Sequence, residues 1–162
     1  MMLDVVGIVV SLTIALGSVA FSHYIAQRIK FRSNFRGLVA ELNYNLKVLA
    51  DIRELSRLDE EAEKENKQAL IAFPKLSRFA FDHFIIEGHL LRLPEKVREK
   101  LLDTYRSFDI INRYADHYNE TKYGVLSVTT GAIEIRKRIR GILKELLIPE
   151  TEQAVKDFLK SI

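Results

Sequence analysis

Residues 5–27, VVGIVVSLTIALGSVAFSHYIAQ, form a run of 23 residues that carries no formal charge when His23 is neutral. As a helix that rises about 1.5 Å per residue, this run is long enough to cross a hydrocarbon core of about 30 Å. We therefore expect residues 1–30 to form a transmembrane anchor with a basic flank, followed by a polar domain.

Two other interpretations of the run stay open. Ser18, Val19 and Ala20 resemble the small-residue cleavage site of a secretory signal, although the only charge before the run is Asp4, where a signal has basic residues. A buried helix of a soluble domain is the other alternative, and such helices are usually shorter than this run.

The charges that flank the run predict its orientation. Arg28, Lys30, Arg32 and Arg36 follow it within nine residues, and no acidic residue occurs there before Glu41. Basic residues favour the cytoplasmic side of a membrane span. We expect a single-pass cell-membrane protein with its N-terminus outside and its C-terminal domain in the cytoplasm.

Small residues recur along one side of the predicted span. Their spacings of three and four place them on a common helix face. Small residues let membrane helices approach closely, so this face predicts self-association or docking on another membrane protein. The residues are Gly7, Ser11, Ala15, Ser18 and Ser22.

Composition limits what the remaining 132 residues can be. They hold 23 Lys and Arg against 21 Asp and Glu, so their net charge of +2 does not indicate a nucleic-acid-binding surface. The chain has no cysteine, which excludes disulfides, thiolate chemistry and cysteine-based zinc sites. The length suits one domain with its own core.

Apolar residues at steps of three and four predict an all-α fold, with an antiparallel bundle of about four helices in residues 31–148. Pro149 is expected to close the last long helix, and residues 149–162 to form a short amphipathic helix. The first seam consists of Phe35, Leu38, Leu42, Asn45, Leu49 and Ile52, and the last of Val125, Val128, Ala132, Ile135, Ile139, Ile142 and Leu146.

Between these long helices, the sequence predicts a solvated acidic connector and two short helices. The connector is DEEAEKENK, residues 59–67. Pro74 separates the expected helices, roughly residues 68–73 and 75–87, and Gly88 ends the second one. A longer helix, about residues 94–122, begins at Pro94.

Three polar residues lie on or beside the apolar seams. Asn45 interrupts the first seam, while Tyr105 and Asn112 lie beside the seam of the helix over residues 94–122. A buried amide is costly unless it is hydrogen-bonded. We expect the three residues to form a buried polar contact that sets the register of the two helices.

Part of the chain resembles a loose pattern in uncharacterised prokaryotic proteins. The matching residues are Glu41-Leu42, Asn45-Leu46, Phe81, Gly88, Leu93-Pro94, Leu101, Tyr105 and Ile111-Asn112. These proteins have one N-terminal membrane helix and a cytoplasmic helical domain. The resemblance covers roughly residues 1–115; it implies this architecture and carries no activity.

Few residues suggest catalysis or metal binding. A metal site on two helices is conceivable, but the chain lacks the Glu-x-x-His and His-x-x-x-His motifs that would favour one. The candidates would be His83, Glu87, Asp116, His117 and Glu120. We expect no enzyme activity, no metal and no cofactor.

A basic cluster in the last long helix is the best candidate for a functional surface. If the helices run up and down from the membrane, this cluster returns to it and joins the basic flank of the span. Juxtamembrane cations attract anionic headgroups, although ordinary helix solvation also explains the charges. The cluster is Arg136, Lys137, Arg138, Arg140 and Lys144.

Together these features predict a scaffold, adaptor or accessory subunit at the cytoplasmic membrane surface, with membrane lipid and either a second copy or another membrane protein as partners. A ligand sensor is the alternative, and it would need a cavity among aromatic residues. Those residues are Phe79, Phe84, Tyr105 and Phe108. A metal-dependent enzyme is a third, more remote possibility.

Overall fold

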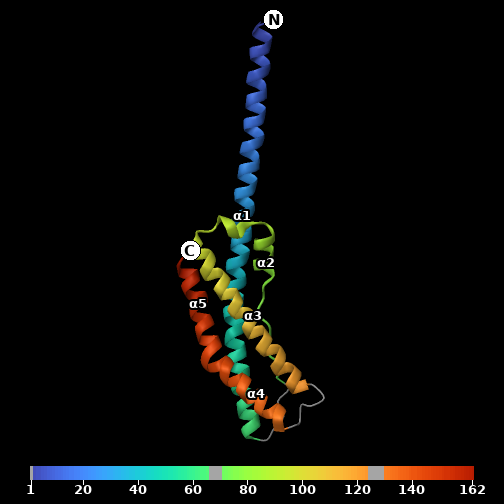
Figure 1. Ribbon diagram of the computed structural model, residues 1–162, viewed down its shortest axis with the longest axis vertical. Coiled ribbons are helices and arrows are strands. Elements are labelled where there is room, and N and C mark those ends of the chain that lie inside the picture. Colours follow the sequence, from blue (N-terminus) through green and yellow to red (C-terminus); the bar gives the residue numbers. More distant parts are fainter. Residues whose placement is uncertain (1, 66–70, 124–129) are drawn as a thin grey trace. The chain divides into compact units, whose positions relative to one another are not determined.

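A computed structural model describes residues 2–65, 71–123 and 130–162. Every regular element within these ranges is helical, which confirms the all-α class. The chain divides into two compact units, Met1–Gly37 and Leu38–Ile162, called unit 1 and unit 2 below. Helix α1 (Met2–Lys64) contributes to both, and each unit is described by itself (Figure 1).

In unit 1, none of the side chains described over residues 7–37 is buried in a core. An 18-residue window of α1 has a mean hydropathy of 1.8, and none of it is buried within the chain. The side chains of Leu16, Val19 and Phe21 are 66–67% exposed. The helix is thus long and apolar enough to cross a membrane.

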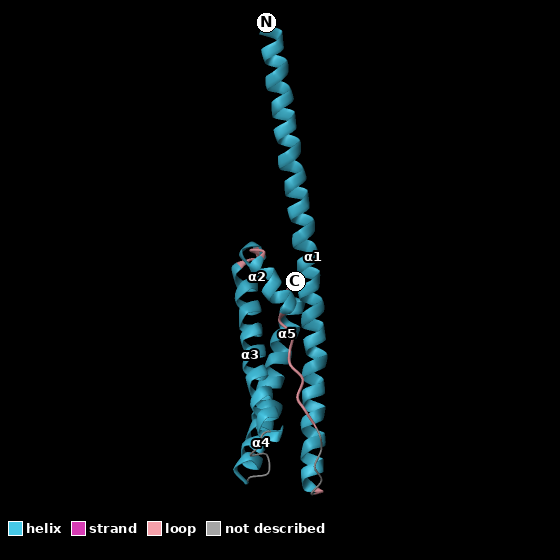
Figure 2. Cartoon of the chain, turned by 90° about the vertical axis from the view of Figure 1, so that its right-hand side faces the viewer, coloured by secondary structure: helices cyan, strands magenta, loops and turns pink. Residues whose placement is uncertain are grey.

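In unit 2, α1 is joined to α3 (Glu95–Tyr123) by an extended segment and two short helices. Residues 71–78, called the strap below, contain no helix and run back along α1 in Figure 2. Helix α2 (Phe79–Ile86) and the 3₁₀ helix η1 (His89–Arg92) follow. The expected second short helix therefore begins at Phe79 and not after Pro74.

Gly88 makes the turn between these two short helices. Its φ of 69° lies in the left-handed region, which glycine adopts without strain. Its N–H donates to the carbonyl oxygen of Ile85 at 2.8 Å and so ends α2. The stop predicted at this glycine is confirmed.

The last helical stretch continues through Pro149 instead of ending there. It consists of α4 (Thr130–Ile142), the π-helical turn η2 (Leu143–Leu147) and α5 (Ile148–Lys160). Pro149 lies in the first turn of α5, and in η2 the N–H of Ile148 bonds to the carbonyl of Leu143, five residues earlier. This wider turn lets the helix pass the proline, which an ordinary α-helix would not accommodate well.

The π-turn also changes which side chains are buried. In α4 and η2 the core positions include Ala132, Ile139 and Leu143; the next is Ile148, five residues on. The predicted stripe is therefore wrong at Ile135, which is 42% exposed, and at Leu146, which is 51% exposed. Val125 and Val128 lie outside the described residues.

The core of unit 2 lies between α1, α3 and the α4–α5 stretch. Along α1, Leu38, Leu42, Asn45, Leu49 and Ile52 are fully buried, as their spacing predicted. Contacts of α3 with α4 and α5 complete this packing. Glu41 and Asp59 of α1 bond to Tyr105 and Tyr118 of α3, so these two helices run in the same direction. Arg53 and Asp59 bond to Glu152 and Arg140, so α4 and α5 run in the opposite direction.

Candidate functional site

The buried polar residues of unit 2 form three groups along α1. They are a carboxylate cluster at Glu41, a row of asparagines on the strap, and an ionic cluster at Asp59. Most of their members have a partner or an environment that differs from the one predicted.

Glu41 joins α1, α2 and α3 through one buried carboxylate. The Tyr105 hydroxyl donates to it at 2.6 Å and the Ser77 hydroxyl at 2.8 Å. Backbone N–H groups of Ala80 and Phe81, at the start of α2, donate at 2.8 and 3.2 Å. Burial and the bond to Glu41 raise the pKa of the Tyr105 hydroxyl, so this group stays a donor.

Three asparagines hold the backbone of the strap. Each side-chain amide both donates to the carbonyl and accepts from the N–H of one strap residue. Asn45 pairs in this way with Ser77, Asn112 with Leu76 and Asn119 with Phe73, at 2.7–3.0 Å. These bonds satisfy an extended segment beside which the described residues form no strand. We call these residues the asparagine clamp.

The clamp corrects the expected contact among Asn45, Tyr105 and Asn112. Asn45 is fully buried, as predicted, but its partner is the strap and not Asn112. Tyr105 bonds to Glu41 instead. The prediction failed because the strap lies between the two helices. Its backbone N–H and carbonyl groups form the hydrogen bonds that the two side-chain amides were expected to form with each other.

Asp59 is the centre of a buried ionic cluster at the far end of α1. Its carboxylate accepts hydrogen bonds from Tyr118, Lys122 and Arg140, and the residue is only 1% exposed. Burial opposes ionisation, but the bonds from Lys122 and Tyr118 outweigh it and lower the pKa of Asp59. The stretch expected to be a solvated connector is thus part of α1 through Lys64, with a buried charge.

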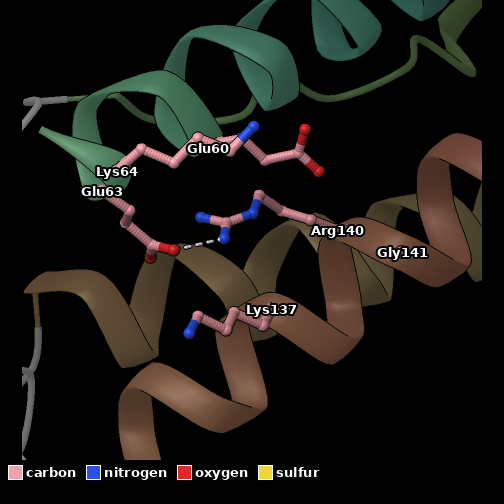
Figure 3. A pocket seen from close by; sticks show the side chains of 6 residues that line it. All are labelled: Glu60, Glu63, Lys64, Lys137, Arg140 and Gly141. Carbon is pink, nitrogen blue, oxygen red and sulfur yellow. Dashed lines mark hydrogen bonds and ion pairs between the residues drawn. The ribbon is translucent and has the colours of Figure 1, made fainter.

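Arg140 links this cluster to a pocket. Its guanidinium donates to Glu63 at 2.6 Å as well as to Asp59, while its Nε has no partner within the described residues. Figure 3 shows Arg140 and Lys137 from α4 facing Glu63 and Lys64 from α1. The pocket has a volume of about 450 Å³ and is completed by Glu60 and Gly141.

The predicted basic cluster is therefore largely occupied by contacts within unit 2. Arg140 is buried against Asp59, Lys144 bonds to Glu60 at 3.0 Å, and Arg136 donates to the carbonyl of Thr121 at 2.9 Å. Lys137 and Arg138 are exposed.

The reason for expecting this cluster near the membrane is also lost. It lies beside residues 59–63 of α1, whereas unit 2 begins at Leu38, about 32 Å away along a helix of this pitch. Because the helix continues to Lys160, the part that returns to the Leu38 end is α5. Contact of the cluster with lipid stays a prediction without that support.

The other residues predicted to form sites are mostly exposed. The small residues of the predicted span and the basic residues that follow it are exposed on α1, and contact with a partner or lipid stays a prediction for them. Within the described ranges no three His, Asp or Glu residues come together as a metal site. Asp116 pairs with Lys75 at 2.9 Å, and His117 lies 3.9 Å from Glu120. His83 and Glu87 lie apart from them on α2 and its C-terminal end.

Sequence reasoning missed Glu41, Asp59 and Asn119. Extending the α1 seam from Ile52 by steps of four and three reaches Ser56 and Asp59, so that signal was present. No protein-family model matches the chain, and neither a curated protein nor a solved structure matches it. Its function is therefore inferred from the chain's own geometry.

Proposed function

We propose that this protein is a membrane-anchored helical interaction module, acting as a scaffold, adaptor or accessory subunit at the cytoplasmic membrane surface. The observation that carries the proposal is the fully exposed apolar window of α1. Side chains such as Leu16 and Phe21 need an apolar environment, and a lipid bilayer supplies one over this length.

The orientation follows from the charges next to this window. Arg28, Lys30, Arg32 and Arg36 favour the cytoplasm, which puts the N-terminus outside. Unit 2, an antiparallel helical bundle in this proposal, then faces the cytoplasm. Its buried polar groups link neighbouring helices through hydrogen bonds and so fix their relative positions. Such rigidity suits a domain that presents a constant surface to a partner.

The small-residue face of α1 is the proposed contact between membrane helices. Ser18 lies on this face, and Leu16 lies on nearly the opposite side of the helix. A photocrosslinking residue at Ser18 should yield a discrete protein adduct in native membranes, and one at Leu16 should yield lipid adducts. Equal adduct patterns at both positions would contradict the proposed helix contact.

Crosslinking also identifies the partner. An adduct of twice the chain mass indicates a second copy, and any other discrete adduct can be identified by mass spectrometry. If the chain is recovered from native membranes only as an uncrosslinked monomer at both positions, the proposal of an interaction module through α1 is wrong.

A ligand-sensing role is the second candidate, and the pocket at Arg140 is the observation that favours it. A volume of about 450 Å³ is in the range of small-molecule sites, and the lining carries the three cations Lys64, Lys137 and Arg140 against the two acids Glu60 and Glu63. The aromatic residues expected to line a cavity do not, because Phe84, Tyr105 and Phe108 are buried core and Phe79 is exposed. Thermal shifts with small anions, lost in Lys137→Ala, would support this role.

A further inference from the structure

The most exposed large apolar side chains of unit 2 belong to one short stretch. Phe79 is 85% exposed, Ile86 is 81% exposed and Leu91 is 78% exposed. The other large apolar side chains described in this unit are at most 56% exposed. Grouped exposed apolar side chains are a feature of protein and membrane contact surfaces.

Two of the three residues share one face of α2. Phe79 and Ile86 are seven residues apart, or about two helical turns, and so lie on the same side. The buried residues Phe81 and Phe84 mark the opposite side. Leu91 follows in η1, directly after the turn at Gly88. We call Phe79, Ile86 and Leu91 the apolar tip.

Unit 2 holds this stretch firmly from behind. The Phe81 ring stacks on Tyr105 with centroids 3.8 Å apart, and the carboxylate of Glu41 accepts the N–H groups of Ala80 and Phe81. Arg78, just before α2, pairs with Asp109. The apolar tip is therefore attached to a well-packed part of unit 2, and its own side chains lie outside the core of this unit.

The position of the tip in unit 2 indicates what covers it. Its base is bonded to Glu41, only three residues after Leu38, where unit 2 begins. The apolar run ends at Gln27, fourteen residues before Glu41, which is a helical length of about 21 Å. This end of the unit is therefore tethered close to the bilayer whenever residues 5–27 span it.

We propose that the apolar tip inserts into the lipid interface of the membrane that α1 crosses. This inference depends on the membrane anchoring proposed above. Interfacial segments bury aromatic and aliphatic side chains at the boundary of headgroups and acyl chains. Near the tip, the exposed cations Arg92 and Lys96 are balanced by the exposed acids Asp82 and Glu95, so apolar insertion drives the contact and neutral lipid suffices.

The chain contains no tryptophan, so a single introduced tryptophan reports its own surroundings. The test uses the full chain, one copy per phosphatidylcholine nanodisc, with Ile86→Trp or Leu91→Trp. Brominated lipids quench a tryptophan that lies in the bilayer. Ile135→Trp is the matched control, because Ile135 is an exposed apolar residue in α4, near the opposite end of the unit. Leu16→Trp reports the membrane span itself.

We expect loss of fluorescence with brominated lipid for Leu16→Trp, Ile86→Trp and Leu91→Trp, and no loss for Ile135→Trp. If Leu16→Trp is quenched while the two tip variants behave like Ile135→Trp, lipid insertion is wrong and the anchor stands. If Leu16→Trp is not quenched, the anchor and the insertion both fail.

The same variants distinguish lipid from a second copy of the chain. A blue-shifted but unquenched emission from Ile86→Trp that appears only in discs holding two copies would identify protein as the cover and overturn the proposal. Circular dichroism of each variant must match the unsubstituted chain, and Leu91→Trp provides an independent readout if Ile86→Trp perturbs α2.

Discussion

Glu41 is the residue at which α1, α2 and α3 meet, because one carboxylate accepts four hydrogen bonds from groups on or next to these helices. Glutamine has nearly the same size, but one of the two acceptor oxygens becomes an NH₂ group. This NH₂ group would face hydroxyl and N–H groups that are themselves donors. Hydrogen bonds to a charged group contribute about 1.5–3 kcal/mol each. We expect Glu41→Gln to lower the free energy of unfolding by about 3 kcal/mol, measured by chemical denaturation in detergent micelles.

Glu54→Gln is the matched control for this change. Glu54 forms an exposed pair with Arg57, and such pairs add little to stability because solvent screens the two charges. An equal loss in both variants would mean that the four bonds to Glu41 add nothing beyond a surface charge.

Asp59 has a lowered pKa, so its contribution to stability depends on pH in one direction. The contribution is complete above the unfolded pKa of about 3.9 and is lost as pH falls through the folded pKa. Asp59→Asn leaves Lys122 without its buried carboxylate and leaves Arg140 with Glu63 as its remaining acidic partner, and it should cost about 3–5 kcal/mol near pH 7. This difference should hold from about pH 5 to 8 and shrink below about pH 4.

The same substitution at Asp103 provides the comparison. Asp103 and Arg106 form a pair in which both side chains are more than 70% exposed, so Asp103→Asn should change stability by less than about 0.5 kcal/mol. A difference for Asp59→Asn that does not shrink in acid would show that the ionised carboxylate is not what holds the cluster.

The asparagine clamp predicts the effect of an apolar residue at position 45. Asn45→Leu leaves the N–H and the carbonyl of Ser77 without their partner, and each unsatisfied buried group costs about 1–3 kcal/mol. We expect a loss of about 2–4 kcal/mol, with Asn43→Leu as the control, because the Asn43 amide is exposed and bonds only within α1. Equal or greater stability of Asn45→Leu would disprove the clamp's structural role.

The burial of Leu38, Leu42, Asn45, Leu49 and Ile52 on α1 was predictable from their spacing, but the partners of the buried polar residues were not. Asn45 stood out because an amide interrupted an apolar seam. Glu41 lies next to that seam, and its burial depends on Tyr105, which is 64 residues away. No local pattern reports such a distant partner.

At the scale of helices, the π-turn η2 contains one residue more than an α-helical seam requires. The core positions Leu143 and Ile148 are five apart, where an α-helix would give three or four. Deleting Leu146 in a Pro149→Ala background should restore an ordinary α-helix and keep α5 in register. We expect a free energy of unfolding within about 1 kcal/mol of Pro149→Ala alone.

Deleting Lys137 in the same background is the control. This exposed residue lies in α4, where every residue fits the α-helical period, so its loss rotates the side chains between it and η2, the buried Ile139 and Arg140 included, by about 100°. The deletion should abolish cooperative unfolding. Similar results for the two deletions would show that η2 is not the site of the extra residue.

The ends of helices were predictable where one residue decides them, as Gly88 does for α2. They were not predictable where packing overrides a local signal. Pro149 is normally a stop signal, yet Val155 and Phe158 bury the helix beyond it, and the π-turn removes the cost of the proline. The strap was also missed, since side-chain amides replace the bonds that a helix would make.

For the whole molecule, the decisive prediction concerns which side of a membrane each end occupies. The chain has no cysteine, so Lys160→Cys provides a single label at the exposed end of α5. In intact cells that express the chain with an N-terminal tag, an impermeant maleimide should label this position only after permeabilisation, while the tag is accessible from outside. In the proposed topology this orientation depends on four cations that follow the apolar run, at Arg28, Lys30, Arg32 and Arg36.

Changing these four residues to glutamine removes the charge asymmetry, and a fraction of chains should then insert the other way, so that the introduced cysteine is labelled without permeabilisation.

A cleaved signal sequence would give a different result, because the tag would be lost and the remaining chain would leave the membrane. A soluble chain with a core helix would be released by alkaline carbonate. Either outcome would remove the anchor, whereas an unchanged orientation in the glutamine variant would show that the basic flank does not direct insertion.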